Sequence, residues 1–335
     1  MAFFQSKKWI AVYMVSLILS LWGCQSPQQT QENVSHSPWA DRVEVICHDF
    51  RDYQPENRFD LIVSNPPGTF SFSKETTIAV GNEEQRIIAE NFASLFTLPA
   101  GFTPQVKTGQ EGDIVFLTDN TMKSDAYELT VLPERITIKA ADVKGFFYAL
   151  QNLRLMLPPT IEGKEKTTDT WSIPSLTIKD APRFNYRGFM LDVSRFFLPK
   201  EDLLRMIDCI AMLKINRLHL HLTDDNGWRL EIKKYPKLTE VGAWKVDRQN
   251  IPFPDRRNPK KEEPATIGGF YTQEDMKEII RYAAERQVEI IPEIDVPAHS
   301  NAALASYPEF ACPVVKDFIG VLPGLGAKNA EIIFC

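Results

Sequence analysis

The sequence lacks a cluster of basic residues. Its formal net charge is −6, and no basic stripe is evident beyond two pairs in one Pro-rich loop, Arg256-Arg257 and Lys260-Lys261. Proteins that bind nucleic acid gather Lys and Arg on one face or along one helix. A solvated loop explains these pairs better, so we expect no nucleic-acid partner.

Cysteine is scarce, with five residues in 335, and no spacing of Cys and His resembles a zinc site. We therefore expect no metal and no cofactor. Cys312 and Cys335 flank a loop rich in Pro and Gly, and we predict that they form a disulfide. Cys209 lies in an apolar helical pattern, which indicates a buried thiol.

The N-terminus has no apolar run long enough to span a bilayer comfortably. Lys7-Lys8 precede an uncharged stretch over residues 9–23, shorter than the ~20 residues that a spanning helix needs. A positive flank with a short apolar core is typical of a secretory signal. The stretch ends at Cys24 and resembles a bacterial lipoprotein signal, although Trp22 replaces the usual small residue.

That resemblance implies a signal over residues 1–24, lipid on Cys24, and export to the periplasm, outer membrane or cell surface. Any membrane contact would then pass through the signal or the lipid. Ordinary cleavage and an uncleaved anchor are the alternatives.

Residues 28–67 carry a second resemblance. An alternating strand is followed by Asp49, and an apolar strand over residues 61–63 leads into Asn65-Pro66-Pro67. This run resembles the middle of a bacterial adenine-N6 methyltransferase that acts on transfer RNA. The resemblance implies that Asp49 holds the cofactor's adenosine and that Asn65 and Pro66 accept the amino group of the target base.

Two parts of that chemistry are missing. Gly68 stands where an aromatic residue would stack on the flipped base, and no Gly-rich strand-to-helix turn precedes the run. About 40 residues are also too few for a doubly wound sheet. We interpret residues 25–67 as an inactive methyltransferase-like segment or a linker, with a methyltransferase remnant as an alternative function.

The rest of the chain predicts two domains. Residues 68–180 read as short strands with helices over 83–96 and 143–157, which is typical of a small α+β domain. Residues 181–335 alternate apolar strands (186–194, 216–228 and 288–300) with helices (200–214 and 272–287), with Thr272 as an N-cap. This α/β alternation indicates a parallel sheet covered by helices, and we expect a buried first strand.

Polar residues gather where these three strands end, as they do at the active-site face of a (β/α)₈ barrel. They are Asp192 and Arg195; Asp224, Asp225 and Trp228; and Glu293, Asp295 and His299. Carboxylates and Arg suit sugar hydroxyls, and an aromatic ring suits the face of a pyranose. Salt-bridged residues at a barrel mouth are the structural alternative.

The stretches YRGFMLDVSRFF, LHLHLTDDNGW and IPEIDVPAHS resemble the first three barrel strands of glycoside hydrolase family 20, the β-N-acetylhexosaminidases. IKDAPRFNYRG resembles the entry into that barrel, and GTFSFSKETTI resembles the start of the accessory domain. The resemblance covers residues 68–335. It implies an exported enzyme that hydrolyses terminal N-acetylglucosamine or N-acetylgalactosamine from glycans.

The resemblance also implies site residues. Arg195 would bind hydroxyls of the terminal sugar, Asp224 and His299 would form a relay toward the catalytic acid, and Asp295 would support the site. In this family the substrate's acetamido oxygen attacks the anomeric carbon, unlike the usual two-carboxylate scheme. An Asp-Glu pair orients the acetamido group and protonates the leaving oxygen.

The sequence holds no Asp-Glu pair. Asp224-Asp225 lies on a different strand from the one that carries the family's pair. Three strand-helix units do not close a barrel, so we expect an incomplete barrel, an exposed strand edge, no hexosaminidase turnover and a tendency to aggregate.

Two further functions stay open. A non-catalytic sugar-binding fragment would need only the Arg195 side of the site. A metal hydrolase would use His219 and His221, which share a face of their strand because side chains alternate. It would need further ligands at other strand ends, and core histidines of a barrel are the favoured interpretation.

Overall fold

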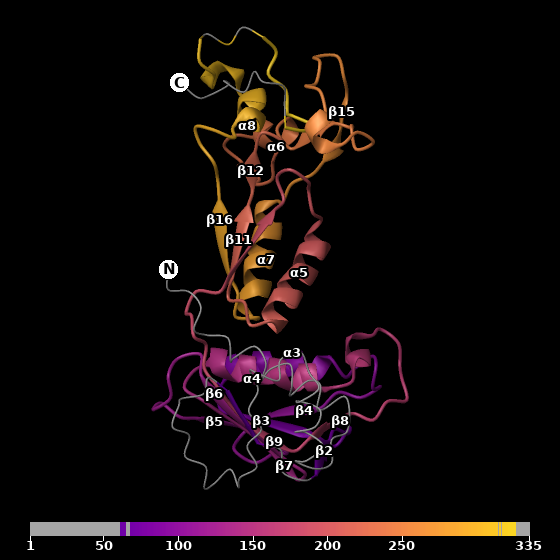
Figure 1. Ribbon diagram of the computed structural model, residues 1–335, viewed down its shortest axis with the longest axis vertical. Coiled ribbons are helices and arrows are strands. Elements are labelled where there is room, and N and C mark those ends of the chain that lie inside the picture. Colours follow the sequence, from indigo (N-terminus) through magenta and orange to yellow (C-terminus); the bar gives the residue numbers. More distant parts are fainter. Residues whose placement is uncertain (1–60, 65–67, 314, 316, 326–335) are drawn as a thin grey trace, which may run out of the picture. The chain divides into compact units, whose positions relative to one another are not determined.

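A computed structural model of the chain describes residues 61–64, 68–313, 315 and 317–325 (Figure 1). The predicted signal, Cys24, Asp49, Asn65, Pro66 and Cys335 lie outside the described residues. The chain divides between Arg183 and Phe184 into two units, and each is described by itself. No helix in the described part of the chain is long and apolar enough to cross a bilayer.

In its described residues, unit 1 consists of a mixed sheet, a two-stranded ladder and the α-helices α3 and α4, as expected for a small α+β domain. The sheet has the order β1-β9-β6-β7-β5-β3-β4, and β2 pairs with β8. Figure 1 shows α3 and α4 on one face of the sheet. The bounds are β1 Leu61–Ser64, β2 Thr69–Ser71, β3 Thr77–Val80, α3 Glu83–Ser94, β4 Gln105–Thr108, β5 Ile114–Thr118, β6 Tyr127–Leu132, β7 Arg135–Ala140, α4 Val143–Met156, β8 Ser172–Pro174 and β9 Leu176–Asp180.

Alternating apolar side chains build the core of unit 1. Leu129 in β6 and Ile138 in β7 are fully buried and directly opposite each other in the antiparallel ladder. A strand sends successive side chains to opposite faces, so one face of the sheet can be apolar throughout. α4 meets this face with Phe146, whose ring stacks on Phe116 at 4.9 Å between centroids. The sheet and its helices therefore share one core.

The sheet of unit 1 starts before the predicted domain boundary at Gly68. Residues 61–64 form β1, which pairs antiparallel with β9 at one edge of the sheet. The apolar strand that resembles a methyltransferase strand is thus an edge strand of the accessory unit. Pairing joins backbone groups, so an apolar extended segment can extend a sheet whatever its origin.

Unit 2 begins with a parallel sheet of order β10-β11-β16, covered by α5 and α7. Figure 1 shows these two helices lying side by side along the sheet. The remaining strands and α6 lie in the sequence between β11 and α7, and α8 follows β16. The bounds are β10 Gly188–Asp192, α5 Lys200–Met212, β11 Arg217–His221, β12 Thr223–Asp224, β13 Gly227–Trp228, α6 Lys237–Glu240, β14 Trp244–Val246, β15 Ala265–Gly268, α7 Gln273–Ala284, β16 Glu289–Glu293 and α8 Asn301–Ser306.

Local sequence signals place the two covering helices. α5 starts directly after Pro199, and α7 starts after Thr272, which forms a capping box with Asp275 as predicted for an N-cap. Lys200 at the start of α5 lies 2.8 Å from Asp275 and 2.9 Å from Glu278 of α7. These ion pairs hold the N-terminal ends of the two helices together beside the C-terminal ends of the strands.

The prediction that the first strand is buried is wrong. In β10 Phe189 and Met190 are exposed, Met190 by 55%. β10 is an edge strand, and Met190 pairs in register with His219, on the sheet face opposite the buried Leu218 and Leu220. That face carries no further layer among the described residues, so its apolar side chains remain open to solvent.

The cysteine predictions have mixed outcomes. Cys209 is an exposed free thiol rather than a buried one. It follows Ile207, which α5 buries, by two residues, or about 200° around the helix, so it points away from the core. Cys312 is disulfide-bonded, and its pairing with Cys335 stays a prediction.

Gly68 adopts a backbone conformation that a side chain would strain. Its φ is +117°, and an added Cβ would lie 2.5 Å from Pro133 Cγ. Its carbonyl accepts a hydrogen bond of 2.9 Å from the Ser175 N–H. Gly68 thus lets the chain pass close to the β6–β7 turn, where Pro133 lies, on its way into β2.

We expect Gly68→Ala to lower the free energy of unfolding by about 2–3 kcal/mol, because both the dihedral and the contact with Pro133 are unfavourable. Urea unfolding of the whole chain measures this. Gly109→Ala is the matched control, since Gly109 also has a positive φ (+143°) but no atom within 4 Å of an added Cβ. Equal losses for the two variants would contradict the role given to Pro133.

Candidate active site

The three parallel strands of unit 2 bring their polar ends into one row. Asp192, His221 and Glu293 are register partners across β10, β11 and β16, and each is the last residue of its strand. Parallel pairing in register places the three side chains on the same face and at the same level. Leu218 and Leu220 lie on the opposite face, because successive side chains of β11 point to opposite sides of the sheet. The apolar layer and the polar row are therefore on different faces.

Asp224, in β12, is the centre of the polar cluster. It is 2% exposed. Its Oδ2 lies 2.6 Å from Arg195 Nη2 and 2.9 Å from His221 Nε2, and its Oδ1 lies 3.3 Å from His299 Nδ1. The Asp225 N–H donates to Oδ1 at 2.6 Å. The structure thus brings together Arg195, Asp224 and His299, three residues that the sequence predicts for the site.

Arg195 is held on one side and open on the other. Its Nη1 donates to Asp192 Oδ2 at 2.8 Å, and a third of its side chain stays exposed. Burial lowers the pKa of Arg195, but the hydrogen bond to Asp192 and the charges of Asp224 and Asp225 outweigh it, and the pKa is raised. The guanidinium stays charged and fixed while part of it faces solvent.

His221 is a member of the cluster that the sequence analysis assigned to a barrel core. Its Nδ1 lies 3.0 Å from Glu293 Oε1, while its Nε2 faces Asp224. Burial lowers the pKa of His221, but hydrogen bonds to Asp224 and Glu293 and the charge of Asp192 raise it overall. The raised pKa favours the charged form of His221, in which each ring nitrogen can donate to one of the two carboxylates.

Glu293 connects both histidines of β11. His219 Nε2 lies 2.5 Å from Glu293 Oε2, beside the His221 contact on Oε1. Burial raises the pKa of Glu293, but the hydrogen bond from His221 and the charges of both histidines lower it overall. The sequence contains a signal for this arrangement. In His-Leu-His the two imidazoles lie on the same face of β11, and Glu293, the last residue of the neighbouring β16, lies on that face as well.

The remaining residues predicted for the site differ in how far they are buried. Asp295 is half-buried, and its N–H donates to Thr223 Oγ1 at 3.1 Å. His299 is half-exposed with a φ of +52°. Trp228, expected as a surface for the sugar, is buried in an apolar cluster with Leu238 and Ala302, because its hairpin folds back onto α6 and α8.

Two triads of side chains have the spacing of metal ligands, namely His221, Asp224 and Asp295, and Asp224, Asp225 and His299. Both depend on Asp224, which the Arg195 guanidinium already neutralises at 2.6 Å. A dication there would be repelled by the guanidinium. The His219–His221 pair of the metal-hydrolase alternative faces Glu293 with both rings, so it does not converge on a metal either. The charges favour an ion-pair network.

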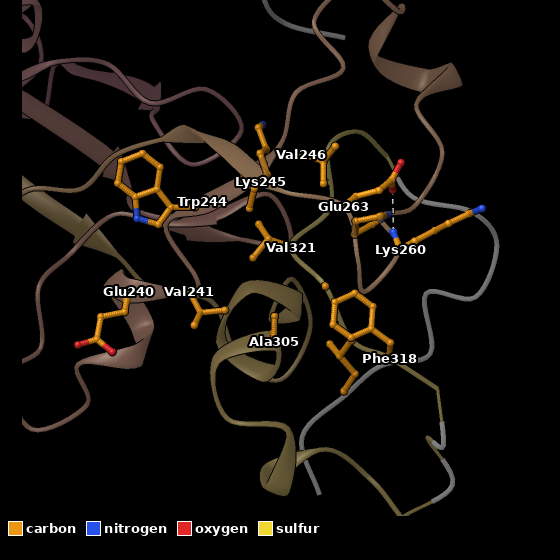
Figure 2. Close-up of a pocket in the computed structure, with 14 residues that line it drawn as sticks. Glu240, Val241, Trp244, Lys245, Val246, Lys260, Glu263, Ala305, Phe318 and Val321 are labelled. Carbon is orange, nitrogen blue, oxygen red and sulfur yellow. Dashed lines mark hydrogen bonds between the residues drawn. The ribbon is translucent and has the colours of Figure 1, made fainter.

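A cavity of about 500 Å³ borders the β14–β15 hairpin (Figure 2). Trp244, Val246, Phe318 and Val321 line its apolar part, and none of its lining residues is a predicted site residue. Figure 2 shows Lys245 of β14 at its border, with the ammonium end pointing away from Val321.

We expect His221→Asn to destabilise unit 2 by about 2 kcal/mol at pH 6, below the range for fully buried pairs because Glu293 is partly exposed. The raised pKa means that His221 stabilises the fold fully below its unfolded pKa of about 6.5, and that this contribution is lost as pH rises through the folded value. Urea unfolding at pH 6 and pH 9 should therefore show a smaller difference from wild type at pH 9. His219→Asn, more exposed and with one carboxylate partner, is the control, and a pH-independent loss for His221→Asn would refute the assignment.

Two family profiles match the chain. The profile described as glycosyl hydrolase family 20, domain 2, matches residues 62–181, and that of the family's catalytic domain matches residues 184–329. The first match includes three residues of β1, in agreement with the early start of the sheet.

Curated relatives are similar in sequence. A beta-hexosaminidase of Porphyromonas gingivalis is 39% identical over 249 residues, which are 73% of this chain and 30% of the relative. An N,N'-diacetylchitobiase of Vibrio harveyi is 44% identical over 195 residues, 56% of this chain and 21% of the relative. The chain thus spans less than a third of these relatives.

Solved structures are similar in fold. A mutant Streptomyces plicatus beta-hexosaminidase in complex with product (GlcNAc) is 34% identical with a TM-score of 0.70, over 82% of this chain and 51% of that one. A beta-N-acetylhexosaminidase from Bacteroides fragilis has 33% identity and a TM-score of 0.60, over 78% and 49%. The two consecutive domain matches, these relatives and the clustered strand ends establish that the chain belongs to glycoside hydrolase family 20.

Proposed function

We propose that unit 2 carries the sugar-binding part of a β-N-acetylhexosaminidase site, which takes the terminal N-acetylglucosamine or N-acetylgalactosamine of glycans. The observation that carries this proposal is Arg195, fixed by Asp192 and Asp224 yet one third exposed at the C-terminal strand ends. A guanidinium held in this way offers its remaining N–H groups in a set direction, which suits vicinal sugar hydroxyls.

Asp224 and His299 form a second part of the proposed site. His299 Nδ1 faces Asp224, so Nε2 is the nitrogen left to contact a general acid. A carboxylate beside an imidazole favours its charged form and fixes its orientation. We propose that Asp224 and His299 orient and tune such an acid, and that Asp295 supports them from the end of β16.

The proposed reaction is substrate-assisted hydrolysis with retention. The acetamido oxygen of the substrate attacks the anomeric carbon, an Asp orients the acetamido group and a Glu protonates the leaving oxygen. The printed sequence contains no Asp-Glu pair, and Asp224 already contacts Arg195, His221 and His299. These 335 residues would therefore bind the sugar without turning it over.

We expect the purified chain to bind N-acetylglucosamine and to release no fluorophore from a fluorogenic N-acetylglucosaminide. Arg195→Met should weaken binding about tenfold to a hundredfold, as expected for charge-assisted hydrogen bonds. Arg205→Met is the control, because Arg205 is an exposed residue of α5. NMR titration measures the binding. Turnover by the chain, or equal affinity of Arg195→Met and wild type, would refute this proposal.

We also propose that the protein is exported through a lipoprotein-type signal with lipid on Cys24. The charged pair Lys7-Lys8, the short apolar run and the cysteine that ends it support this. In a bacterial host, labelling with palmitate should depend on Cys24 and disappear in Cys24→Ser. Labelling that persists in the variant would contradict lipidation at this residue.

A further inference from the structure

The segment that carries Arg195 has no strand or helix to hold its backbone. Residues 193–195 lie between β10 and α5 and belong to neither. Asp192 Oδ1 accepts hydrogen bonds from the Ser194 and Arg195 N–H groups, each at 3.0 Å. The Val193 N–H donates to the His221 carbonyl of β11 at 3.3 Å, so all three N–H groups of this segment are satisfied, two of them by the last residue of β10.

Its three successive carbonyl groups all face buried cations. Arg229 Nε donates to Val193 O at 3.0 Å, and Arg229 Nη2 donates to Ser194 O at 2.6 Å. Lys245 Nζ donates to Arg195 O at 2.6 Å. In a strand such carbonyls would alternate in direction and pair with a neighbouring strand. Here two side chains from later in the sequence replace that ladder.

Arg229 is fully buried and bonds to backbone carbonyls. Besides the two above, its guanidinium donates to Ala243 O at 2.6 Å and to Gly269 O at 3.0 Å, near the ends of the β14–β15 hairpin. Burial lowers the pKa of Arg229 to about 10. A buried cation is costly unless its donors are satisfied, and here they join the Arg195 segment to that hairpin.

Lys245 reaches the same segment from inside β14. The residue is 3% exposed, and its Nζ lies 4.9 Å from the centroid of the Phe196 ring. Burial lowers the pKa of Lys245 to about 8, with the charges of Arg229 and Arg256 acting in the same direction and Asp192 opposing them. Among the described residues, these three are the charged groups that shift the pKa of Lys245.

We propose that Lys245 and Arg229 are positioning residues, which fix the backbone of residues 193–195 and thereby aim the Arg195 side chain at the sugar. The aim toward a sugar rests on the proposed function, whereas the clamp on the backbone does not. Without the two cations, the carbonyls of this segment would have to find water or move, and the guanidinium would lose its fixed direction.

Lys245 offers the sharper test because its charge can be removed or kept. Lys245→Met removes the charge at similar length, and we expect about tenfold weaker binding of N-acetylglucosamine to the whole chain. Lys245→Arg should recover most of that loss. Lys277→Met, at a 70% exposed residue of α7, should bind like wild type. Unchanged affinity in Lys245→Met would overturn the proposal.

A pH profile separates positioning from bulk stability. Wild-type affinity should fall between pH 7 and pH 9, as Lys245 loses its proton and its hydrogen bond weakens, while Lys245→Arg should hold its affinity over that range. The stability of the fold should change in the opposite direction. Because the pKa of Lys245 is about 8 in the folded chain and 10.5 when unfolded, the free energy of unfolding should rise as pH increases from about 8. Parallel pH profiles for wild type and Lys245→Arg would contradict the proposal.

Hydrogen–deuterium exchange distinguishes failure of the clamp from failure of the proposed function. In Lys245→Met the peptide that contains residues 193–196 should exchange about tenfold faster, with α3 and α4 unchanged. If wild type binds no N-acetylglucosamine, the proposed function fails and exchange still tests the clamp. If Lys245→Met does not fold, protection factors of wild type and Lys245→Arg across pH 7–9 decide. Equal exchange of residues 193–196 in all variants would overturn the clamp.

Discussion

The site depends on one buried carboxylate that a guanidinium and two imidazole rings share. The Oδ2 atom of Asp224 contacts both Arg195 and His221, and its Oδ1 atom faces His299. Burying a carboxylate without partners destabilises a fold, so these contacts stabilise the fold around Asp224. Since the partners come from the ends of three strands, the charge of Asp224 ties those ends together. The direction of Arg195 and of the His299 ring follows from it.

Much of this arrangement could be predicted from the sequence. The alternation of apolar strands and amphipathic helices, the N-cap Thr272 and the polar strand ends depend on local periodicity and capping, which the sequence displays directly. The residues Arg195, Asp224 and His299 followed from resemblance to a family, and the structure brings them together. Local patterns therefore predicted the strands and helices around the site, and resemblance to the family predicted three of its residues.

The rest could not be predicted because it depends on contacts far apart in the sequence. Arg229 and Lys245 bond to backbone carbonyls, which leave no trace in residue identity. Trp228 was expected at the surface, but a hairpin folds it into an apolar cluster. The exposure of Met190 follows from its place on a sheet face that no further layer covers among the described residues. Burial, unlike periodicity, is decided by which neighbours are present.

The most direct test of the account is the protonation state of His221. If this ring bridges Asp224 and Glu293 by donating from both nitrogens, ¹⁵N NMR of the ring at pH 7 should show both Nδ1 and Nε2 protonated, with titration only above the ordinary histidine pKa of about 6.5. A neutral ring at pH 7, with one protonated nitrogen, would contradict the charge network on which the site depends.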